Sequence, residues 1–378
     1  MITVLVAGDI CPKDRLKKRF SDRDFNFVFG LIKPYFKGCD VSIGNFECAL
    51  ADSQDIPIVK CGPNLSCDEN FVDALRWMGF NVLTLANNHF ADYGASSMQK
   101  SISAMTSRGI LHVGAGMDLK TAQKSLVIDV KEKRIGIINC CEHEFSIATD
   151  DFAGCNPLDP VEQCKEIQRL RSSVDFILVI VHGGTEFCQL PSPRMKKLYR
   201  FFVDQGADVV INHHQHCFSG YEQYKGKHIL YGIGNFCFDW DGKRKSSWNE
   251  GYLAQIIFND DGCQKFDMIP YKQCDEEARV TPIVSEKEIK EFYDEVYKLN
   301  AIIADDKKMN TDYYSWIDSH ERNTKMTLSV YSTRFFRALC NRGFLPSFIT
   351  KKRMVLLYNH VNCESHRDRI LHYIEKRI

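Results

Sequence analysis

Apolar runs that end in polar residues recur along the first 215 residues of the chain. Short runs rich in Val, Ile and Leu alternate with segments in which apolar residues recur every three to four positions. This alternation is typical of βα units that build a largely parallel sheet. The apolar runs predict strands at residues 3–7, 41–43, 82–85, 176–181 and 209–211.

Capping residues indicate where helices lie between these strands. Asp68 is a suitable N-cap, and Gly79 a suitable stop, for a helix that runs through Trp77. Pro160 suits the first turn of a helix that runs to about Arg171. The same signals predict helices at about 21–36, 94–107 and 193–204, and a β-hairpin formed by 126–130 and 134–139.

The pattern changes after residue 216. Strand-like runs separated by turn signals predict antiparallel strands at 217–224, 228–232, 252–258 and 263–269. Residues 232–236 are expected to form a tight loop. From about residue 285 the chain is rich in Lys, Glu and Asp with helical spacing, and a break is expected near Gly343 to Pro346. We therefore expect an α/β sandwich of two packed sheets over residues 1–284 and a helical appendage over 285–378.

Composition narrows the class of protein. Lys and Arg together number 49, as do Asp and Glu, so the formal charge is zero and a nucleic-acid partner is not expected. The chain has no apolar run of the roughly 20 residues that span a bilayer, and residues 1–8 do not resemble a signal peptide. The 16 cysteines are scattered without a C-x-x-C pair, which favours reduced, mostly buried thiols. We therefore predict a cytoplasmic protein without an integral membrane segment.

A polar cluster follows each strand of the predicted parallel part. The clusters are Gly8-Asp9, Asn45-Phe46-Glu47, Asn87-Asn88-His89, His182-Gly183-Gly184 and His213-His214-Gln215-His216. Taken singly, most of them have an ordinary explanation as turns or caps. The histidine cluster and His182, which ends a six-residue apolar run, are the stronger signals. Because α/β folds bind ligands at the carboxyl ends of their strands, the joint pattern predicts a metal site.

The residue types in these clusters are those that a dinuclear metal centre requires. Carboxylate, amide and imidazole ligands are available at Asp9, Glu47, Asn88, His182, His214 and His216. His214 and His216 are two positions apart and would point to the same side of an extended segment. His89, next to Asn88, is suitably placed to protonate a leaving group.

Three further polar features have weaker interpretations. The segment Glu142-His143-Glu144 is either part of the pocket rim or a hydrogen-bonded loop. Glu186 is a candidate to orient a ligating histidine from behind. The remaining histidines lack such a context and are expected to be structural or surface residues: His112, His228, His320, His360, His366 and His372.

Seven ordered motifs allow the chain to be compared with a known family. They are Gly8-Asp9, Asn45-Phe46-Glu47, the segment 85–89 with Asp92-Tyr93-Gly94, Val113-Gly114-Ala115-Gly116, the segment 182–186, the segment 206–216, and Tyr231-Gly232-Ile233-Gly234-Asn235-Phe236. Over about residues 1–240 this set resembles the bacterial capsule-synthesis CapA family, also called the poly-γ-glutamate biosynthesis or PGA_cap family.

The resemblance implies more than the residues alone. The CapA family is similar to the calcineurin-like metallophosphoesterases, so a four-layer α/β/β/α fold with two divalent metal ions, Mn, Fe or Zn, is expected. The implied ligands are Asp9, Glu47, Asn88, His182, His214 and His216. His89 would then act as the leaving-group acid or stabilise the transition state.

The chain also departs from the pattern of those enzymes. Ile10-Cys11 follows Asp9 where a typical metallophosphoesterase has an Asp-x-His pair, so one imidazole is missing. The motif Asn45-Phe46-Glu47 replaces the usual Gly-Asp-x-x-Asp, which leaves open whether Asn45 or Glu47 bridges the metals. Glu47 is favoured because a bridge between cations favours an anion. Family members are usually membrane-anchored, and no anchor is visible in this sequence.

The resemblance predicts a metal-dependent hydrolase of phosphate esters, linked to capsule or other envelope-polymer synthesis. Its substrate would be a small molecule or a polymer with a phosphate or acyl group, and a partner from the capsule machinery is expected. An amide-bond hydrolase or ligase for a γ-glutamyl polymer is a variant on the same site. The alternative is a non-catalytic accessory component that binds a polymer or a partner.

Overall fold

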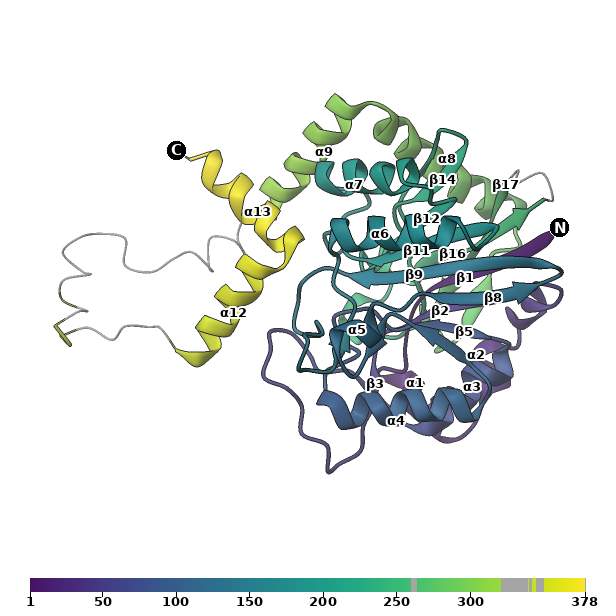
Figure 1. The fold of residues 1–378 in the computed structure, drawn as a ribbon, viewed down its shortest axis with the longest axis horizontal. Coiled ribbons are helices and arrows are strands. Elements are labelled where there is room, and N and C mark those ends of the chain that lie inside the picture. The colour runs from purple at the N-terminus through teal and green to yellow at the C-terminus, as the bar shows by residue number, and fades with distance from the viewer. Residues whose placement is uncertain (260–263, 321–338, 340–341, 345–349, 378) are drawn as a thin grey trace.

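Two β-sheets lie face to face between outer layers of helices (Figure 1). The computed structural model describes residues 1–259, 264–320, 339, 342–344 and 350–377. The predicted four-layer α/β/β/α arrangement with helices at the C-terminus is confirmed. The break predicted near Gly343 to Pro346 lies partly outside the described residues.

The first sheet has eight strands and is parallel at its centre. Its order is β18 (Val280–Pro282), β17 (Gln264–Gln273), β16 (Glu250–Phe258), β1 (Ile2–Cys11), β2 (Val41–Phe46), β5 (Val82–Thr84) and β6 (Leu111–Val113), and β15 (Asn235–Phe238) also pairs with β1. Strands β2, β5, β6 and β15 extend the parallel part, whereas β16, β17 and β18 run antiparallel.

The second sheet has six strands. Its order is β13 (Tyr221–Tyr224), β14 (Lys227–Leu230), β12 (Val209–His213), β11 (Phe176–His182), β9 (Lys133–Cys141) and β8 (Leu126–Val130). The prediction of antiparallel pairing after residue 216 is wrong for β14, which lies parallel to β12 and pairs antiparallel only with β13. Two short pairs complete the strands: β3 (Ala49–Leu50) with β4 (Ser66–Cys67), and β7 (Ala115–Gly116) with β10 (Gly154–Cys155).

Successive side chains of β1 point to opposite faces of the first sheet, and both faces are buried. Val4 and Val6 join the core between the two sheets, whereas Leu5 and Ala7 join the core under the first helical layer. That layer consists of α1 (Arg15–Ser21), α2 (Phe25–Phe29), α3 (Glu69–Met78) and α4 (Gly94–Ser107). The segment predicted as one helix over 21–36 is divided into α1, α2 and a 3₁₀ turn at Lys33–Phe36.

The opposite layer covers the second sheet. It contains α6 (Pro160–Arg171) and α7 (Pro193–Asp204), with the predicted bounds, and the short α5 (Leu119–Ala122) lies at the side of the fold. The first two C-terminal helices, α8 (Glu286–Ala304) and α9 (Asp306–Ser319), bury residues such as Val296 and Tyr313 in the same core as the second sheet.

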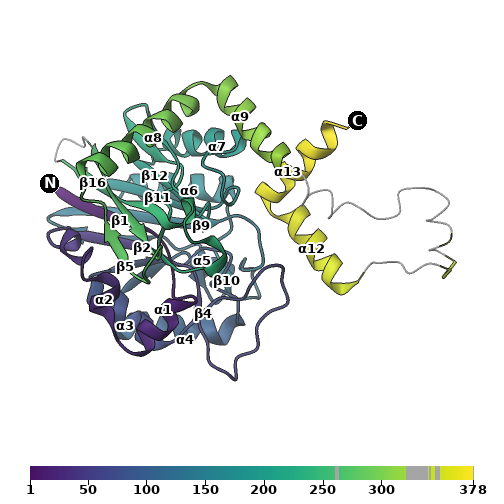
Figure 2. The same ribbon diagram turned by 180° about the vertical axis from the view of Figure 1, so that it is seen from behind.

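The last two helices lie at the end of the molecule, with α13 beside α9 and α12 against α13 (Figures 1 and 2). They are α12 (Lys351–Asn362) and α13 (Glu364–Glu375). The rings of Tyr314 on α9 and His372 on α13 stack with centroids 4.2 Å apart, and His372 Nε2 lies 3.1 Å from Asp318 Oδ1. The division of the chain into domains at residue 284 stays a prediction.

Candidate metal centre

The polar clusters predicted at strand ends lie together in space. Asp9 in β1 is in register with Asn45 in β2 and with Asn235 in β15. In the second sheet, His182 at the end of β11 is in register with His213 at the end of β12. The carboxyl ends of the parallel strands of both sheets therefore meet at one edge, as α/β folds require for a ligand site.

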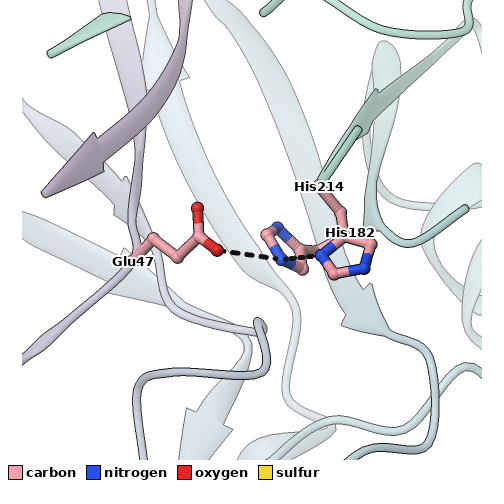
Figure 3. A group of neighbouring side chains, drawn as sticks. All are labelled: Glu47, His182 and His214. Carbon is pink, nitrogen blue, oxygen red and sulfur yellow. Dashed lines mark hydrogen bonds and ion pairs between the residues drawn. The ribbon is translucent and has the colours of Figure 1, made fainter. Parts of the chain in front are cut away.

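All six predicted metal ligands are buried at this edge. Three groups have ligand atoms that lie within 4.8 Å of one another: Glu47, His182 and His214 (Figure 3); Asp9, Glu47 and His216; and Glu186, His214 and His216. Glu47 belongs to two of these groups. The amide nitrogen of Asn45 donates a hydrogen bond to Asp9 Oδ1 at 2.7 Å, which fixes that carboxylate.

Glu47 offers a direct test of whether these residues fit a metal ion. Both of its carboxylate oxygens are buried and lack a hydrogen-bond partner among the described residues. The nearby ring nitrogens His182 Nε2 and His216 Nε2 lie 3.6 Å and 3.7 Å from Oε1. Burial, followed by the charge of Asp9, raises the pKa of Glu47 well above its usual value. An unpartnered buried carboxylate is costly, so a bound divalent cation fits this position.

Asp9 is a buried carboxylate whose charge is stabilised by neighbouring histidines. Burial works against its charge, but His213 and His216 outweigh burial and hold its pKa well below the usual value. His213 Nδ1 lies 3.2 Å from Oδ1, and His216 Nδ1 lies 3.3 Å from Oδ2. The sequence lacks an imidazole two residues after Asp9, but His213 brings one close to Asp9 from the second sheet.

His182, His214 and Asn88 converge on one point. His182 Nε2 lies 2.9 Å from Asn88 Oδ1 and 3.0 Å from His214 Nδ1. Burial, followed by the neighbouring His214, lowers the pKa of His182 well below its usual value. The imidazole is therefore neutral at pH 7, which is the form that binds a metal.

The backbone of the histidine cluster differs from the extended segment that the sequence predicts. His214 and His216 have φ angles of 86° and 56°, in the left-handed region that residues other than glycine seldom adopt. Their ring centroids lie 5.9 Å apart. The two rings thus reach one site through a strained turn rather than through the alternation of a strand.

His89 belongs to a buried polar triad beside the ligands. Its Nδ1 lies 2.8 Å from Asp92 Oδ2 and 3.0 Å from Lys60 Nζ, and Lys60 also forms an ion pair with Asp92. Burial and then the charge of Lys60 lower the pKa of His89 to about 4. The sequence provides no signal for Lys60, because it lies in a stretch without helical or strand periodicity.

Asn235 is a second site residue that the sequence-based prediction missed. Its Oδ1 lies 2.9 Å from His216 Nδ1. The tight loop expected at 232–236 is wrong in part, because Asn235 begins β15. The backbone of this segment nevertheless approaches β1 closely: a Cβ atom at Gly8 would collide with the carbonyl oxygen of Gly234. The Gly-Asn-Phe motif was the signal that could have indicated this role.

The structure places Glu186 and the segment Glu142–Glu144, whose sequence-based interpretations were weaker, in different positions relative to the site. Glu186 lies close enough to His214 and His216 to share a cation with them, so it faces the imidazoles directly. Glu142 forms an ion pair of 2.6 Å with Arg194. Although burial opposes its ionisation, Arg194 lowers the pKa of Glu142 to about 2. Glu144 Oε1 lies 3.6 Å from His214 Nε2, so this end of the segment Glu142–Glu144 borders the site.

The fold and the site define a four-layer α/β protein with buried carboxylate and imidazole clusters that are compatible with metal binding. Residues 3–240 match the model of the family described as bacterial capsule synthesis protein PGA_cap. The chain therefore belongs to this family, as its motifs predicted.

Two relatives are proteins of capsule or polyglutamate synthesis. The chain is 31% identical over 279 residues to the capsule biosynthesis protein CapA of Bacillus anthracis, covering 71% of this chain and 67% of that one. It is 28% identical over 276 residues to the PGA biosynthesis protein CapA of Bacillus subtilis, covering 71% of each.

Solved structures show only distant similarity. A phosphatase of Mycoplasma pneumoniae gives a TM-score of 0.47 at 15% identity, covering 73% of this chain and 95% of that one. A hypothetical protein of Thermus thermophilus gives 0.46 at 13% identity, with coverages of 72% and 99%. At this level of similarity the two structures do not bear on function. Among the helices of the described residues, none has the length and apolar composition needed to cross a bilayer.

Proposed function

We propose that the chain is a metal-dependent hydrolase that cleaves phosphate esters at a dinuclear centre. The observation that carries this proposal is Glu47, whose two buried oxygens lack a hydrogen-bond partner among the described residues and which is shared by two ligand groups. One ion would be held by Asp9, Glu47 and His216, and the other by Glu47, Asn88, His182 and His214. Two such ions supply charge neutralisation for the phosphoryl group and a hydroxide at neutral pH.

The surrounding residues prepare the ligands for this role. Asn45 donates to Asp9 at 2.7 Å, and Asn235 Oδ1 lies 2.9 Å from His216 Nδ1. Such contacts fix the rotamer of a carboxylate and the tautomer of an imidazole, which leaves the other ring nitrogen, His216 Nε2, to face Glu47. The buried strand ends also exclude bulk water, so the charges of the site act in a medium of low polarity.

His89 is proposed to donate a proton to the leaving oxygen. Because its pKa is about 4, the ring is neutral at pH 7 and the proton that it donates is a single N–H. For this role the proton lies on Nε2 and Nδ1 accepts from Lys60 Nζ, 3.0 Å away. With the proton on Nδ1 the ring would instead donate to Asp92 Oδ2, at 2.8 Å, and Nε2 would have no proton to give, so Lys60 is proposed to select the first tautomer. Asp92 accepts from Lys60 and keeps its ammonium group in place.

The family relatives indicate the pathway in which such a hydrolase would act. The Bacillus relatives are named for capsule and PGA biosynthesis, and a mycobacterial relative, 28% identical over 184 residues, is described as a probable polyglutamine synthesis accessory protein. We propose that the substrate belongs to the synthesis of a capsule or another envelope polymer. The alternative is a non-catalytic accessory component. The missing imidazole after Asp9 favours this alternative.

Metal content and hydrolysis, measured together, decide between the two functions. Purified protein is analysed for bound metal and assayed with Mn²⁺ on phosphate mono- and diesters. We expect His182→Ala and His214→Ala to lose metal and activity together, since each removes an imidazole at the point where the ligands converge. His112→Ala, a change of a histidine on β6, serves as the control. A metal-free His214→Ala protein that retains full activity would exclude the proposed mechanism.

A further inference from the structure

A second cluster of metal-ligating side chains lies outside the six predicted ligands. Glu144 follows β9, whereas Cys363 and His366 come from the start of α13, more than 200 positions later in the sequence. One ligand atom of each of these three residues lies within 4.8 Å of the other two. The tertiary structure alone brings a carboxylate, a thiol and an imidazole together at this place.

We propose that Glu144, Cys363 and His366 form a third cation site, which binds Zn²⁺ or a chemically similar ion. Thiolate, imidazole and carboxylate are the ligand types that zinc prefers, and three protein ligands leave a fourth tetrahedral position open. This ligand set differs from that of the candidate dinuclear centre, whose groups contain carboxylates and imidazoles without a thiol. The two sites therefore differ in the metal that they favour.

Burial and hydrogen bonding hold two of the three ligands in position. Cys363 is 1% exposed, and its thiol donates to Glu142 Oε2 at 3.7 Å, a proton that it would release on binding an ion as the thiolate. The Nδ1 atom of His366 lies 3.0 Å from the side-chain amide of Asn359 on α12, which leaves Nε2 as the ring nitrogen for an ion. A contact of this kind fixes the orientation of a ligating imidazole.

Glu144 differs from its neighbour Glu142 in how its charge is balanced. Glu142 has Arg194 at 2.6 Å. In the described part of the chain no lysine or arginine forms an ion pair with Glu144, and its one ion-pair contact is with His214 Nε2, at 3.6 Å. A cation between Glu144 and α13 would balance this carboxylate. It would also lie next to the dinuclear centre, because Glu144 borders both sites.

An ion at this position would join the C-terminal helices to the catalytic part of the chain. Other contacts already hold α13 against the segment Glu142–Glu144 and against α7: His143 Nδ1 lies 2.6 Å from Glu364 Oε1, and Arg194 Nε, on α7, donates to Asp368 Oδ2 at 2.7 Å. The predicted third ion adds a metal-dependent attachment to these polar contacts. The binding of Zn²⁺ should therefore reduce hydrogen exchange in α13.

Cobalt substitution tests the site through its thiolate ligand. The full-length protein is loaded with Co²⁺, and its absorption spectrum is recorded for a thiolate-to-cobalt charge-transfer band. We expect the band in the wild type and its loss in Cys363→Ser, which keeps a hydrogen-bonding group of similar size. Cys164→Ser, a change of another buried cysteine on α6, should retain the band. His366→Gln should weaken Co²⁺ binding about tenfold or more.

The test separates this site from the proposed dinuclear centre. His182→Ala removes a ligand of the centre and should leave the thiolate band unchanged, so failure of the hydrolase proposal would not affect the result. Native mass spectrometry should show one Zn²⁺ fewer in Cys363→Ser than in the wild type. The absence of a thiolate band in the wild type, or its persistence in Cys363→Ser, would overturn the inference. If circular dichroism shows that Cys363→Ser is unfolded, Co²⁺ binding is measured instead on His366→Gln and Glu144→Gln, which should both weaken it, and unchanged binding in both would overturn the inference.

Discussion

Glu47→Gln should stabilise the metal-free protein and weaken the metal-bound one. In the metal-free state the Glu47 carboxylate is fully buried and lacks a hydrogen-bond partner among the described residues. Burial, followed by the charge of Asp9, raises its pKa well above the usual value. Glutamine has nearly the same shape without the charge, so it removes the cost of burying an ionised group.

The magnitude follows from the link between pKa and stability. Each unit by which folding raises the pKa of an acid costs about 1.4 kcal/mol once the pH exceeds the folded pKa. For a buried group without partners we expect Glu47→Gln to gain roughly 1–3 kcal/mol at pH 7 in EDTA. For a chain of this size this corresponds to an increase in Tm of about 1–2 °C per kcal/mol.

The pH dependence has a defined sign. Below the pKa of the unfolded carboxyl, about 4.3, Glu47 is protonated in both states and costs nothing. As the pH rises through this value the unfolded state ionises first, so the metal-free wild type loses stability until the folded pKa is passed. The advantage of the Gln variant should therefore be absent near pH 3–4 and grow towards neutrality.

Thermal unfolding with and without metal provides the assay. In EDTA the Gln variant should melt above the wild type, and with saturating Mn²⁺ or Zn²⁺ the order should reverse, because binding to the folded state stabilises it in proportion to affinity. Glu132→Gln, a change of an exposed carboxylate in the turn between β8 and β9, should shift stability by less than about 0.5 kcal/mol. A Gln variant that is less stable than the wild type in EDTA at pH 7 would refute the reasoning.

Two other predictions concern residues near the site. Lys60→Met should lower kcat about 100-fold with unchanged metal content, because His89 Nδ1 would then face Asp92 alone and carry the ring proton in place of Nε2. NMR titration should also show the pKa of His89 rising from about 4 towards its usual value. Unchanged kcat in Lys60→Met would contradict the role given to the ammonium group, and Lys60→Arg should retain part of the activity. Arg194→Met should cost about 3–5 kcal/mol in the free energy of unfolding, since it leaves Glu142 buried without its partner. It should also speed hydrogen exchange in α13 by breaking the contact with Asp368, and protection equal to the wild type would show that this contact is dispensable.

Local signals in the sequence were sufficient for most of the helices and parallel strands. Asp68 caps α3 through the backbone N–H of Phe71, and Gly79 ends it with a left-handed φ of 116°, as their residue types predict. The alternation of short apolar runs with such helices identified the class of fold. These features depend on interactions between residues a few positions apart, so they can be read from the sequence directly.

Strand β15 could not be predicted in this way. Residues 235–238 form a strand because β1, more than 220 positions earlier, provides a parallel partner. A short run of four residues that includes Asn and Cys has no periodicity of its own. Its pairing brings Asn235 to His216, so a site residue was missed together with the strand.

The sequence by itself determined that carboxylate, amide and imidazole groups follow buried parallel strands, because strand ends and their polar residues are local features. It also determined the family, through ordered motifs. Only the tertiary structure decided which groups share a point in space: it brought Lys60 to His89 and the start of α13 to Glu144. The physical reason is that desolvation and contact depend on segments that are distant in the sequence. The burial of Glu47 without a hydrogen bond to its carboxylate among the described residues, on which the proposed function depends, is therefore a property of the fold.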